Sequence, residues 1–116
     1  MHEVSIADSI LDLIERQLGS PHALVKVELC IGPLSGVSAD SLEFCFPTVA
    51  LARGFGSPAL SIQRTLIKIH CEECLSDYQV QDLMSFCPHC RSWKRTILSG
   101  NELQLVSATL GEEPYV

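Results

Sequence analysis

The sequence predicts an α+β fold in which two helices lie on a three-stranded sheet and a zinc ribbon is inserted between two of the strands. Apolar residues recur every three or four positions in two segments and every second position in others, and these spacings distinguish helices from strands. Late in the chain, Cys71 and Cys74 form one Cys-x-x-Cys pair, and Cys87 and Cys90 form another after a loop of twelve residues. Two such pairs are typical of a tetrahedral thiolate site of the zinc-ribbon kind.

Both helices are predicted from apolar residues that share one face. The first spans about residues 4–18 and is followed by the stop signal of Gly19 and Pro21. Ser38 is a potential N-cap for the second helix, and Pro47 within that helix predicts a kink or an early end. The apolar faces consist of Val4, Ala7, Ile10, Leu11, Ile14 and Leu18 in the first helix, and Leu42, Cys45, Phe46 and Val49 in the second.

The strands are predicted from alternation and from β-branched residues. Residues 24–31 alternate, and residues 59–70 predict a single second strand that leads directly into Cys71. Residues 94–97 predict a short strand that returns to the main body. Residues 102–110 predict the third strand of the sheet, with Leu103 and Leu105 on one face and Val106, Ala108 and Leu110 on the other.

We therefore expect two structural units. Residues 1–69 together with 94–116 form an α/β domain, and residues 70–93 form the inserted zinc-binding ribbon. A chain of 116 residues is long enough for one ordinary domain with such an insert.

Composition and charge exclude several classes of protein. Hydrophobic residues make up 47% of the chain and charged residues 19%, which is typical of a globular protein. The net charge of −6 argues against a protein that binds duplex nucleic acid. Neither a signal peptide nor an apolar run long enough to span a bilayer is visible. Six cysteines without an export signal favour the cytoplasm, and metal binding in preference to disulfides.

The four paired cysteines predict a closed zinc site, because four thiolates leave no open coordination position. The alternative is two redox dithiols or disulfides. A zinc enzyme would need an open position, and the sequence has no recognisable nucleophile–base pair or phosphate-binding loop, so we expect a protein that is not an enzyme.

His2 is a second candidate metal ligand. The terminal amine of Met1, the amide nitrogen of His2 and its imidazole can close fused chelate rings around one ion, and such nitrogen ligands suit Ni(II) or Cu(II). Glu3 can add an amide nitrogen or a carboxylate oxygen. This geometry requires a free amine at Met1, and the alternative is that a histidine at the second position is accidental.

Several motifs in this order resemble the HypA/HybF family of nickel metallochaperones, which act in [NiFe]-hydrogenase maturation and in some bacteria also serve urease. The motifs are Met1-His2-Glu3, Gly32-x-Leu34-Ser35-Gly36-Val37, Leu42-x-Phe44, the paired cysteines with Cys87-Pro-x-Cys90, and Gly100-x-Glu102-Leu103. The resemblance covers nearly the whole chain. One departure is Arg91, which stands where the family often has glycine after the last cysteine.

The resemblance implies that the α/β domain binds Ni(II) at Met1, His2 and Glu3 and that Cys71, Cys74, Cys87 and Cys90 hold a structural Zn(II). It also implies two partners, a nickel-binding GTPase of hydrogenase maturation and the precursor of the [NiFe]-hydrogenase large subunit, with no role for nucleic acid or membrane.

The remaining polar residues near the ribbon leave an alternative function open. Arg91, Trp93, Lys94 and Arg95 form a basic and aromatic cluster, which is the kind of surface that single-stranded nucleic acid or a protein assembly can bind. His70 and His89 flank zinc cysteines, and we expect them to hydrogen-bond a thiolate at most. Cys30 and Cys45 are expected to be packing residues.

Overall fold

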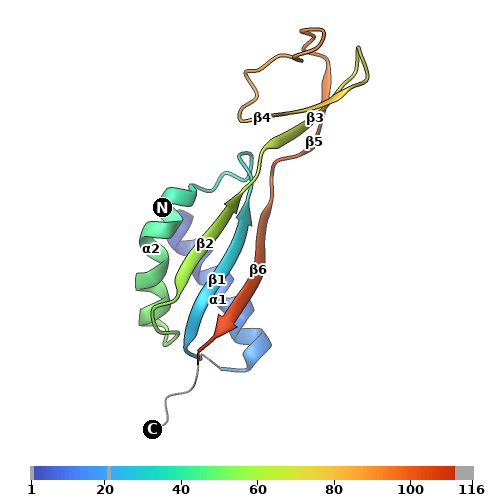
Figure 1. The fold of residues 1–116 in the computed structure, drawn as a ribbon. Helices are drawn as coiled ribbons and strands as arrows, with labels where there is room; N and C mark the ends of the chain where they lie inside the picture. The colour runs from blue at the N-terminus through green and yellow to red at the C-terminus, as the bar shows by residue number, and fades with distance from the viewer. Residues whose placement is uncertain (1, 21, 112–116) are drawn as a thin grey trace.

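The computed structural model describes residues 2–20 and 22–111, which form an elongated molecule of 64 × 24 × 19 Å. Two three-stranded sheets follow one another along its length, and both helices lie on one face of the first sheet (Figure 1). The element order is α1(His2–Leu18), β1(Leu24–Ile31), α2(Ala39–Ala52), β2(Ala59–Arg64), β3(Ile67–Cys71), β4(Asp77–Val80), β5(Arg95–Ser99) and β6(Leu103–Leu110).

The first sheet and the two helices make up what we call the body. Its strand order is β2-β1-β6, with β1 parallel to β2 and antiparallel to β6. This arrangement confirms the prediction of two helices on a three-stranded sheet. Within residues 2–20 and 22–111, no helix has both the length and the apolar character required to cross a bilayer.

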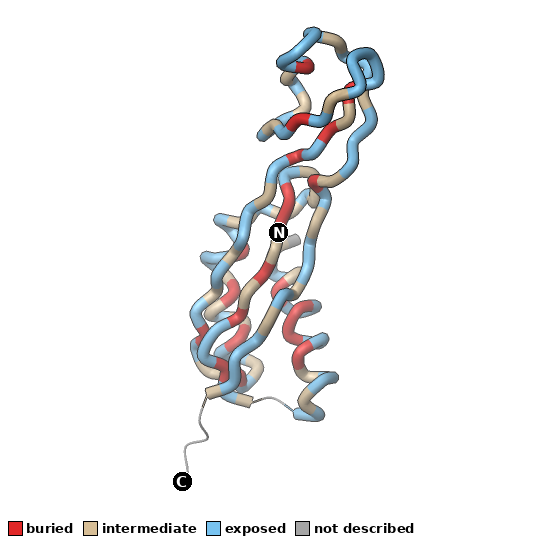
Figure 2. The backbone as a smooth tube through the Cα atoms, turned by 45° about the vertical axis from the view of Figure 1, so that its right-hand side comes forward, coloured by how far each residue is buried: buried red, intermediate tan, exposed pale blue. Residues whose placement is uncertain are grey.

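The core of the body lies between the helices and the sheet (Figure 2). Removal of this apolar surface from water is the main force that holds the helices on the sheet. Buried residues of α1 and α2 are mostly those that the helical spacing predicts. The core consists of Ala7, Ile10, Leu11, Ile14, Leu24, Val27, Leu29, Ile31, Leu42, Phe46, Ala50 and Phe55.

Helix α2 begins as predicted but does not end early. The Ser38 side chain accepts a hydrogen bond from the Ser41 N–H at 3.2 Å and so caps the helix. The helix continues beyond Pro47 to Ala52. Pro47 removes one backbone hydrogen bond, but Phe46 and Ala50, on either side of it, are completely buried, and their packing keeps the chain helical.

The prediction of one continuous strand over residues 59–70 is wrong. The chain breaks at Thr65 and Leu66, so that β2 belongs to the body and β3 to the second sheet. The short strand predicted at 94–97 exists as β5, but it pairs with β3 and not with the body. The β-branched pattern does not reveal the break, because the residues on both sides of it form strands, although the two strands belong to different sheets.

A β-bulge corrects the predicted faces of the last strand. Leu29 pairs with Leu105, whereas Glu28 pairs with Ser107, so Val106 is an extra residue on β6. Directly paired residues share a face of the sheet. Ala108, which pairs with the buried Val27, therefore lies on the same face as Leu105 and not on the opposite one.

The second sheet, with strand order β4-β3-β5, forms what we call the ribbon. Its core is small and consists of Ile67, Ile69, Cys71, Tyr78 and Cys87. The paired strands begin before residue 70 and end after residue 93, since β3 starts at Ile67 and β5 ends at Ser99. We therefore propose that the ribbon extends from Leu66 to Gly100.

Candidate metal centres

The structure brings the four predicted cysteines together at the far end of the ribbon. Their Sγ atoms all lie within 4.8 Å of one another. The Cys71 and Cys90 sulfurs are 3.5 Å apart, and those of Cys74 and Cys87 are 3.6 Å apart. One cysteine of each pair is buried, Cys71 and Cys87, and the other is exposed.

These distances fit zinc. A tetrahedral ion with Zn–S bonds of about 2.3 Å has Sγ–Sγ separations of about 3.8 Å. A disulfide would require a separation of about 2.05 Å, and all six cysteines of the chain are free thiols. The geometry therefore favours a metal site over disulfides. Among the described residues, no histidine, aspartate or glutamate belongs to this cluster.

Each cysteine pair lies in a tight turn, and the two turns are alike. After the second cysteine of each pair the chain adopts a left-handed conformation, at Leu75 (φ 66°) and Arg91 (φ 64°). The N–H groups of these two residues donate to the carbonyls of Cys71 and Cys87, at 3.0 and 2.8 Å. A left-handed backbone favours glycine. This preference explains why glycine suits the position that Arg91 occupies in this chain.

Hydrogen bonds to sulfur prepare two of the thiols for ionisation. The Ser76 hydroxyl lies 3.0 Å from the Cys74 sulfur, and this contact lowers the pKa of Cys74. Desolvation opposes ionisation of Cys87, but the backbone N–H groups of Cys90 and His89, with the neighbouring thiols, lower its pKa to about 6. Because zinc binds thiolates, these hydrogen bonds favour the form that a metal needs at Cys74 and Cys87. At Cys90 a hydrogen bond from the Ser92 backbone acts in the same direction, but desolvation and the neighbouring thiols raise the pKa of Cys90 to about 12.

The two histidines next to the cysteines do not place their imidazoles in the sulfur cluster. The Nδ1 atom of His70 lies 2.7 Å from a carboxylate oxygen of Asp77, which faces it across the β3–β4 pair. His89 is exposed, and its backbone N–H interacts with the Cys87 sulfur. Neither imidazole joins the sulfur cluster, in line with the expected role outside the coordination shell.

The second candidate site lies at the start of α1. The predictions for Met1 and for the side chain of His2 lie outside the residues that the structure describes. Glu3 is described, and its carboxylate accepts a hydrogen bond from the Ser38 N–H at 2.9 Å. This bond lowers the pKa of Glu3. The first turn of α1 is thereby attached to the N-cap of α2.

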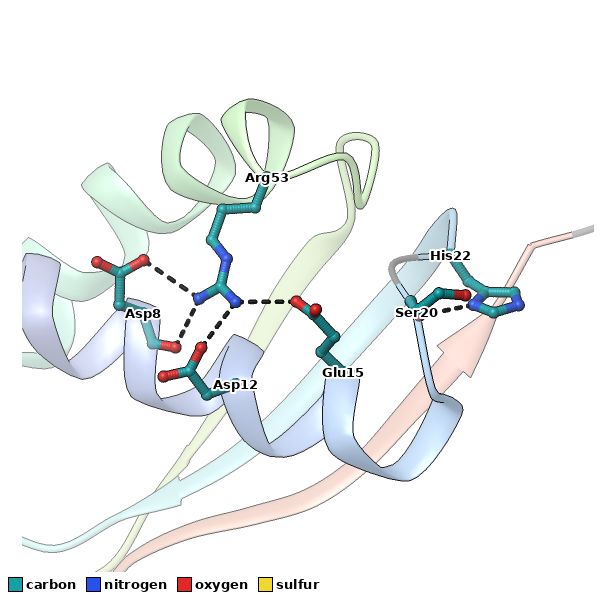
Figure 3. A network of polar contacts seen from close by, with 6 residues as sticks. All are labelled: Asp8, Asp12, Glu15, Ser20, His22 and Arg53. Atoms are coloured by element: carbon teal, nitrogen blue, oxygen red, sulfur yellow. Dashed lines mark hydrogen bonds and ion pairs between the residues drawn. The ribbon is translucent and has the colours of Figure 1, made fainter.

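Helices α1 and α2 run in the same direction, so that their N-termini lie together. At their other ends, the Arg53 guanidinium, just after α2, contacts three carboxylates of α1 (Figure 3). The distances are 3.3 Å to Asp8, 2.7 Å to Asp12 and 3.0 Å to Glu15. Glu3 and Arg53 thus fix the register of the two helices at both ends, and with it the position of the first turn of α1.

The paired helix N-termini face the end of the body that carries the ribbon. Arg64, the last residue of β2, forms an ion pair with Asp40 in the first turn of α2 at 2.7 Å. The next residue, Thr65, leads into the ribbon. A cleft of about 510 Å³ lies here between the body and the ribbon, lined by Ile31, Gly32, Pro33, Val37, Ala39, Arg64, Thr65, Leu66 and Gln81.

Three chain segments form the joint between body and ribbon, namely 32–34, 65–66 and 100–102. The Gly32 N–H donates to the Glu102 carbonyl at 2.9 Å, and the Leu34 N–H to the Gly100 carbonyl at 2.7 Å. The Thr65 hydroxyl donates to the Glu102 carboxylate at 2.9 Å. A Cβ atom at Gly32 would lie only 2.2 Å from the Gly100 oxygen. This backbone packing fixes how the ribbon leaves the body.

Sequence reasoning missed two features of these sites. The repeated pattern Cys-x-x-Cys-x-Ser, ending at Ser76 and Ser92, marks both turns and was available in the sequence. In both turns the cysteine N–H donates to that serine's carbonyl, at 2.8 Å from Cys71 and 3.2 Å from Cys87. The hydrogen bond between Glu3 and Ser38 joins residues 35 positions apart, and no local sequence pattern predicts it.

Comparison with known proteins agrees with this geometry. Residues 1–110 match the family described as "Hydrogenase/urease nickel incorporation, metallochaperone, hypA". A hydrogenase maturation factor HypA from Chlorobium limicola is 36% identical over 114 residues, covering 97% of this chain and 98% of the relative. The corresponding protein from Parabacteroides distasonis is 38% identical over 117 residues, covering 97% of this chain and all of the relative.

The fold also resembles solved structures. The solution structure of the nickel metallochaperone HypA from Helicobacter pylori has a TM-score of 0.60 and 24% identity, and the likeness covers 97% of this chain and 100% of that one. A second solution structure, of a HypA protein, has a TM-score of 0.62. At this identity the likeness concerns the fold alone.

Proposed function

Because the chain belongs to the HypA family of nickel metallochaperones, we propose that it binds Ni(II) at its N-terminus and delivers the ion during maturation of [NiFe]-hydrogenase. The ligands in this proposal are the Met1 amine, the amide and imidazole nitrogens of His2, and Glu3. The observation that carries it is that the sequence Met1-His2-Glu3 stands at the head of α1 in a chain of this family.

The start of a helix suits such a site. The first N–H groups of an α-helix have no acceptor within the helix, so metal can displace the amide protons of His2 and Glu3 without breaking the helix. A bare cation at this end would be opposed by the helix dipole. Two deprotonated amides offset the two charges of Ni(II) and remove this conflict.

Glu3 is proposed to contribute its amide nitrogen and not its carboxylate. The carboxylate already accepts the Ser38 N–H at 2.9 Å and connects α1 to α2. A ligand role for the carboxylate would require this bond to break. Glu3→Gln is therefore expected to bind Ni(II) with nearly unchanged stoichiometry.

The four cysteines are proposed to hold a structural Zn(II). Four thiolates saturate the ion, which leaves no position for cargo, and the ion would hold together a ribbon whose own core is small. The two metals then have separate tasks, since zinc maintains the ribbon and nickel is passed on.

The proposed recipients are a nickel-binding GTPase of hydrogenase maturation and the precursor of the hydrogenase large subunit, with urease as a further target and the cytoplasm as the compartment. Support for the compartment comes from six cysteines that form no disulfide, which is the usual state of cysteines in a reducing environment. Transfer of Ni(II) from the loaded protein to the purified GTPase, measured after separation of the two, tests the first partner. If the ion stays on the donor, that partner is wrong.

The nickel site is tested by titrating Ni(II) into the zinc-loaded protein with an unextended Met1, followed by absorption spectroscopy and calorimetry. We expect one Ni(II) per chain, and loss of this binding in His2→Ala with the zinc content unchanged. His22→Ala is the matched control, because His22 lies beyond the other end of α1 and contacts the Ser20 carbonyl at 2.9 Å (Figure 3). Equal binding by His2→Ala and the unaltered protein would refute the proposal.

A further inference from the structure

The ribbon carries an aromatic pair that its own core does not use. The rings of Phe86 and Trp93 have centroids 4.5 Å apart and cross at 68°. Phe86 is 49% exposed and Trp93 47% exposed, and Met84 in the same segment as Phe86 is 78% exposed. None of the three belongs to the buried core of the ribbon. Contiguous exposed apolar patches with polar residues at their rim are typical of interaction sites.

Arg95 holds this pair in position. Its guanidinium lies 4.7 Å from the centroid of the Trp93 ring. The same group donates to the Leu83 carbonyl at 2.9 Å and to the Ser85 carbonyl at 3.1 Å. Segment 83–86 is thereby fixed against the start of β5. These contacts preorganise the surface, and preorganisation lowers the entropy cost of binding.

The segment around Trp93 is also basic, although residues 66–100 as a whole contain four basic and four acidic side chains. Arg91 and Lys94 are exposed and flank Trp93 in the chain, so that three of the eight Lys and Arg residues fall within five positions. In the part of the chain that the structure describes, none of these three forms an ion pair, whereas Lys26, Arg53 and Arg64 of the body all do. The side chains of Arg91 and Lys94, unlike that of Arg95, are therefore available to an external anion.

We propose that this ribbon patch, consisting of Met84, Phe86, Arg91, Trp93, Lys94 and Arg95, is a docking surface for an acidic segment of a partner protein that also carries apolar side chains. The apolar centre would bury the partner's apolar residues, and the flanking cations would pair with its carboxylates. Trp and Arg are the residues that most often dominate the energy of such interfaces, and complementary charge speeds the encounter.

Single-stranded nucleic acid fits this surface less well. Bases stack on free aromatic faces, but Arg95 already covers the Trp93 ring and Phe86 packs against it. The whole chain has a net charge of −6, so the residues outside the patch, without its three cations, carry a net charge of −9, which repels a polyanion that extends beyond the patch. A short acidic protein segment avoids both difficulties.

Trp93 is the only tryptophan of the chain, so its emission reports directly on the patch. The probe is a fluorescein-labelled peptide in which Glu and Asp alternate with Leu and Phe, compared with the same peptide carrying Gln and Asn in place of the acids, and with a dT oligonucleotide of equal charge. We expect saturable binding of the acidic peptide by the zinc-loaded protein, at least about tenfold tighter than binding of the neutral peptide or the oligonucleotide.

Two variants test the residues. Trp93→Ala and the double change Arg91→Gln with Lys94→Gln are each expected to weaken binding about tenfold in anisotropy measurements, with zinc content unchanged. Arg16→Gln is the matched control, because Arg16 is an exposed cation of the body, and this change should leave binding within about twofold. Nickel is absent throughout, so the result is independent of the nickel site.

Three outcomes would overturn the proposal. Tighter binding of the oligonucleotide would make the surface a nucleic-acid site. An equal loss on Arg16→Gln would show attraction without a defined surface. Lack of peptide binding, together with self-association that Trp93→Ala abolishes, would identify a second copy of the chain as the occupant.

Discussion

The body and the ribbon of this protein are stabilised in different ways. The body has twelve buried apolar residues contributed by two helices and a sheet. The ribbon has five, and two of these, Cys71 and Cys87, are cysteines of the proposed zinc site. A core of this size rarely supports a fold without a metal or disulfide. We therefore expect the body to fold by hydrophobic burial and the ribbon to depend on the zinc ion proposed for its four cysteines.

Removal of zinc should unfold the ribbon but not the body, and this is the largest effect that we expect. Structural zinc contributes about 10–16 kcal/mol to the folding of zinc-finger peptides at pH 7, far more than the small ribbon core can replace. We expect Cys87→Ser, or zinc chelation, to unfold the ribbon while the body stays folded. In ¹H–¹⁵N NMR spectra, signals of β3–β5 should collapse to random-coil positions and those of α1 and β1 should persist.

Cys45→Ser is the control for the loss of a thiol, since Cys45 lies on α2 and is half-buried outside the sulfur cluster. It should leave both units folded and the zinc content unchanged. If the ribbon signals of Cys87→Ser keep their native positions, the ribbon folds without a metal, and the proposed difference in stabilisation between body and ribbon is wrong.

The joint determines whether the two units move together, and Gly32→Ala should loosen it. A Cβ at Gly32 would lie 2.2 Å from the Gly100 oxygen and 2.4 Å from the Glu102 carboxylate, so the backbones must separate. Overpacking of this kind costs about 1–3 kcal/mol. We expect a lower melting temperature and, in small-angle scattering and residual dipolar couplings, a ribbon whose orientation to the body is no longer fixed.

Gly36→Ala distinguishes this clash from the general cost of replacing a glycine. Gly36 has φ 81° but nothing within 4 Å of an added Cβ, so alanine there should cost about 1–2 kcal/mol through backbone strain alone. The orientation of the ribbon should stay fixed in this variant. If both variants keep the ribbon in place, the contact of Gly32 with Gly100 does not determine the geometry of the joint.

The same contrast explains how much of the fold the sequence predicts. The helices and strands of the body follow from spacing, because a residue's face in an element depends on near neighbours. The four cysteines follow from their spacing, since a metal site needs closely spaced ligands. At the break, Thr65 contacts Ile31 and Glu102, and β5 pairs with β3, so that each of these contacts joins residues more than twenty positions apart in the chain. Local patterns do not contain that information.

The candidate sites divide in the same manner. The four cysteines are recognisable as a group, and the turns that hold them repeat in the sequence. The proposed nickel ligands are adjacent in the chain, but the contact that attaches Glu3 to Ser38 joins distant residues and is brought about only by the fold. Of the patch, Arg91, Trp93, Lys94 and Arg95 are visible in the sequence as a basic and aromatic cluster. The addition of Met84 and Phe86 and the role of Arg95 in fixing the rings are properties of the structure.

The smallest expected effect is the contribution of the Glu3 carboxylate to the stability of the body. The Ser38 N–H lowers the pKa of the Glu3 carboxyl below its usual value, so the folded state favours the charged form. Its contribution to stability is complete above the ordinary Glu pKa of about 4.3 and disappears as the pH falls through the lower value of the folded state. The melting temperature of the body should therefore be slightly lower in Glu3→Gln at neutral pH, and the difference should vanish in acid.

This pH dependence separates a structural role of the carboxylate from a ligand role. Glu73→Gln controls for the loss of one charge, because Glu73 is an exposed residue of the ribbon, and its melting difference from the unaltered protein should not follow the same course. If Glu3→Gln has the same melting temperature as the unaltered protein at every pH but no longer binds Ni(II), the carboxylate is a nickel ligand and does not stabilise the contact between the helices. The proposed ligand set would then exchange the Glu3 amide for its carboxylate oxygen, and the first turn of α1 would have to move away from Ser38 when nickel binds.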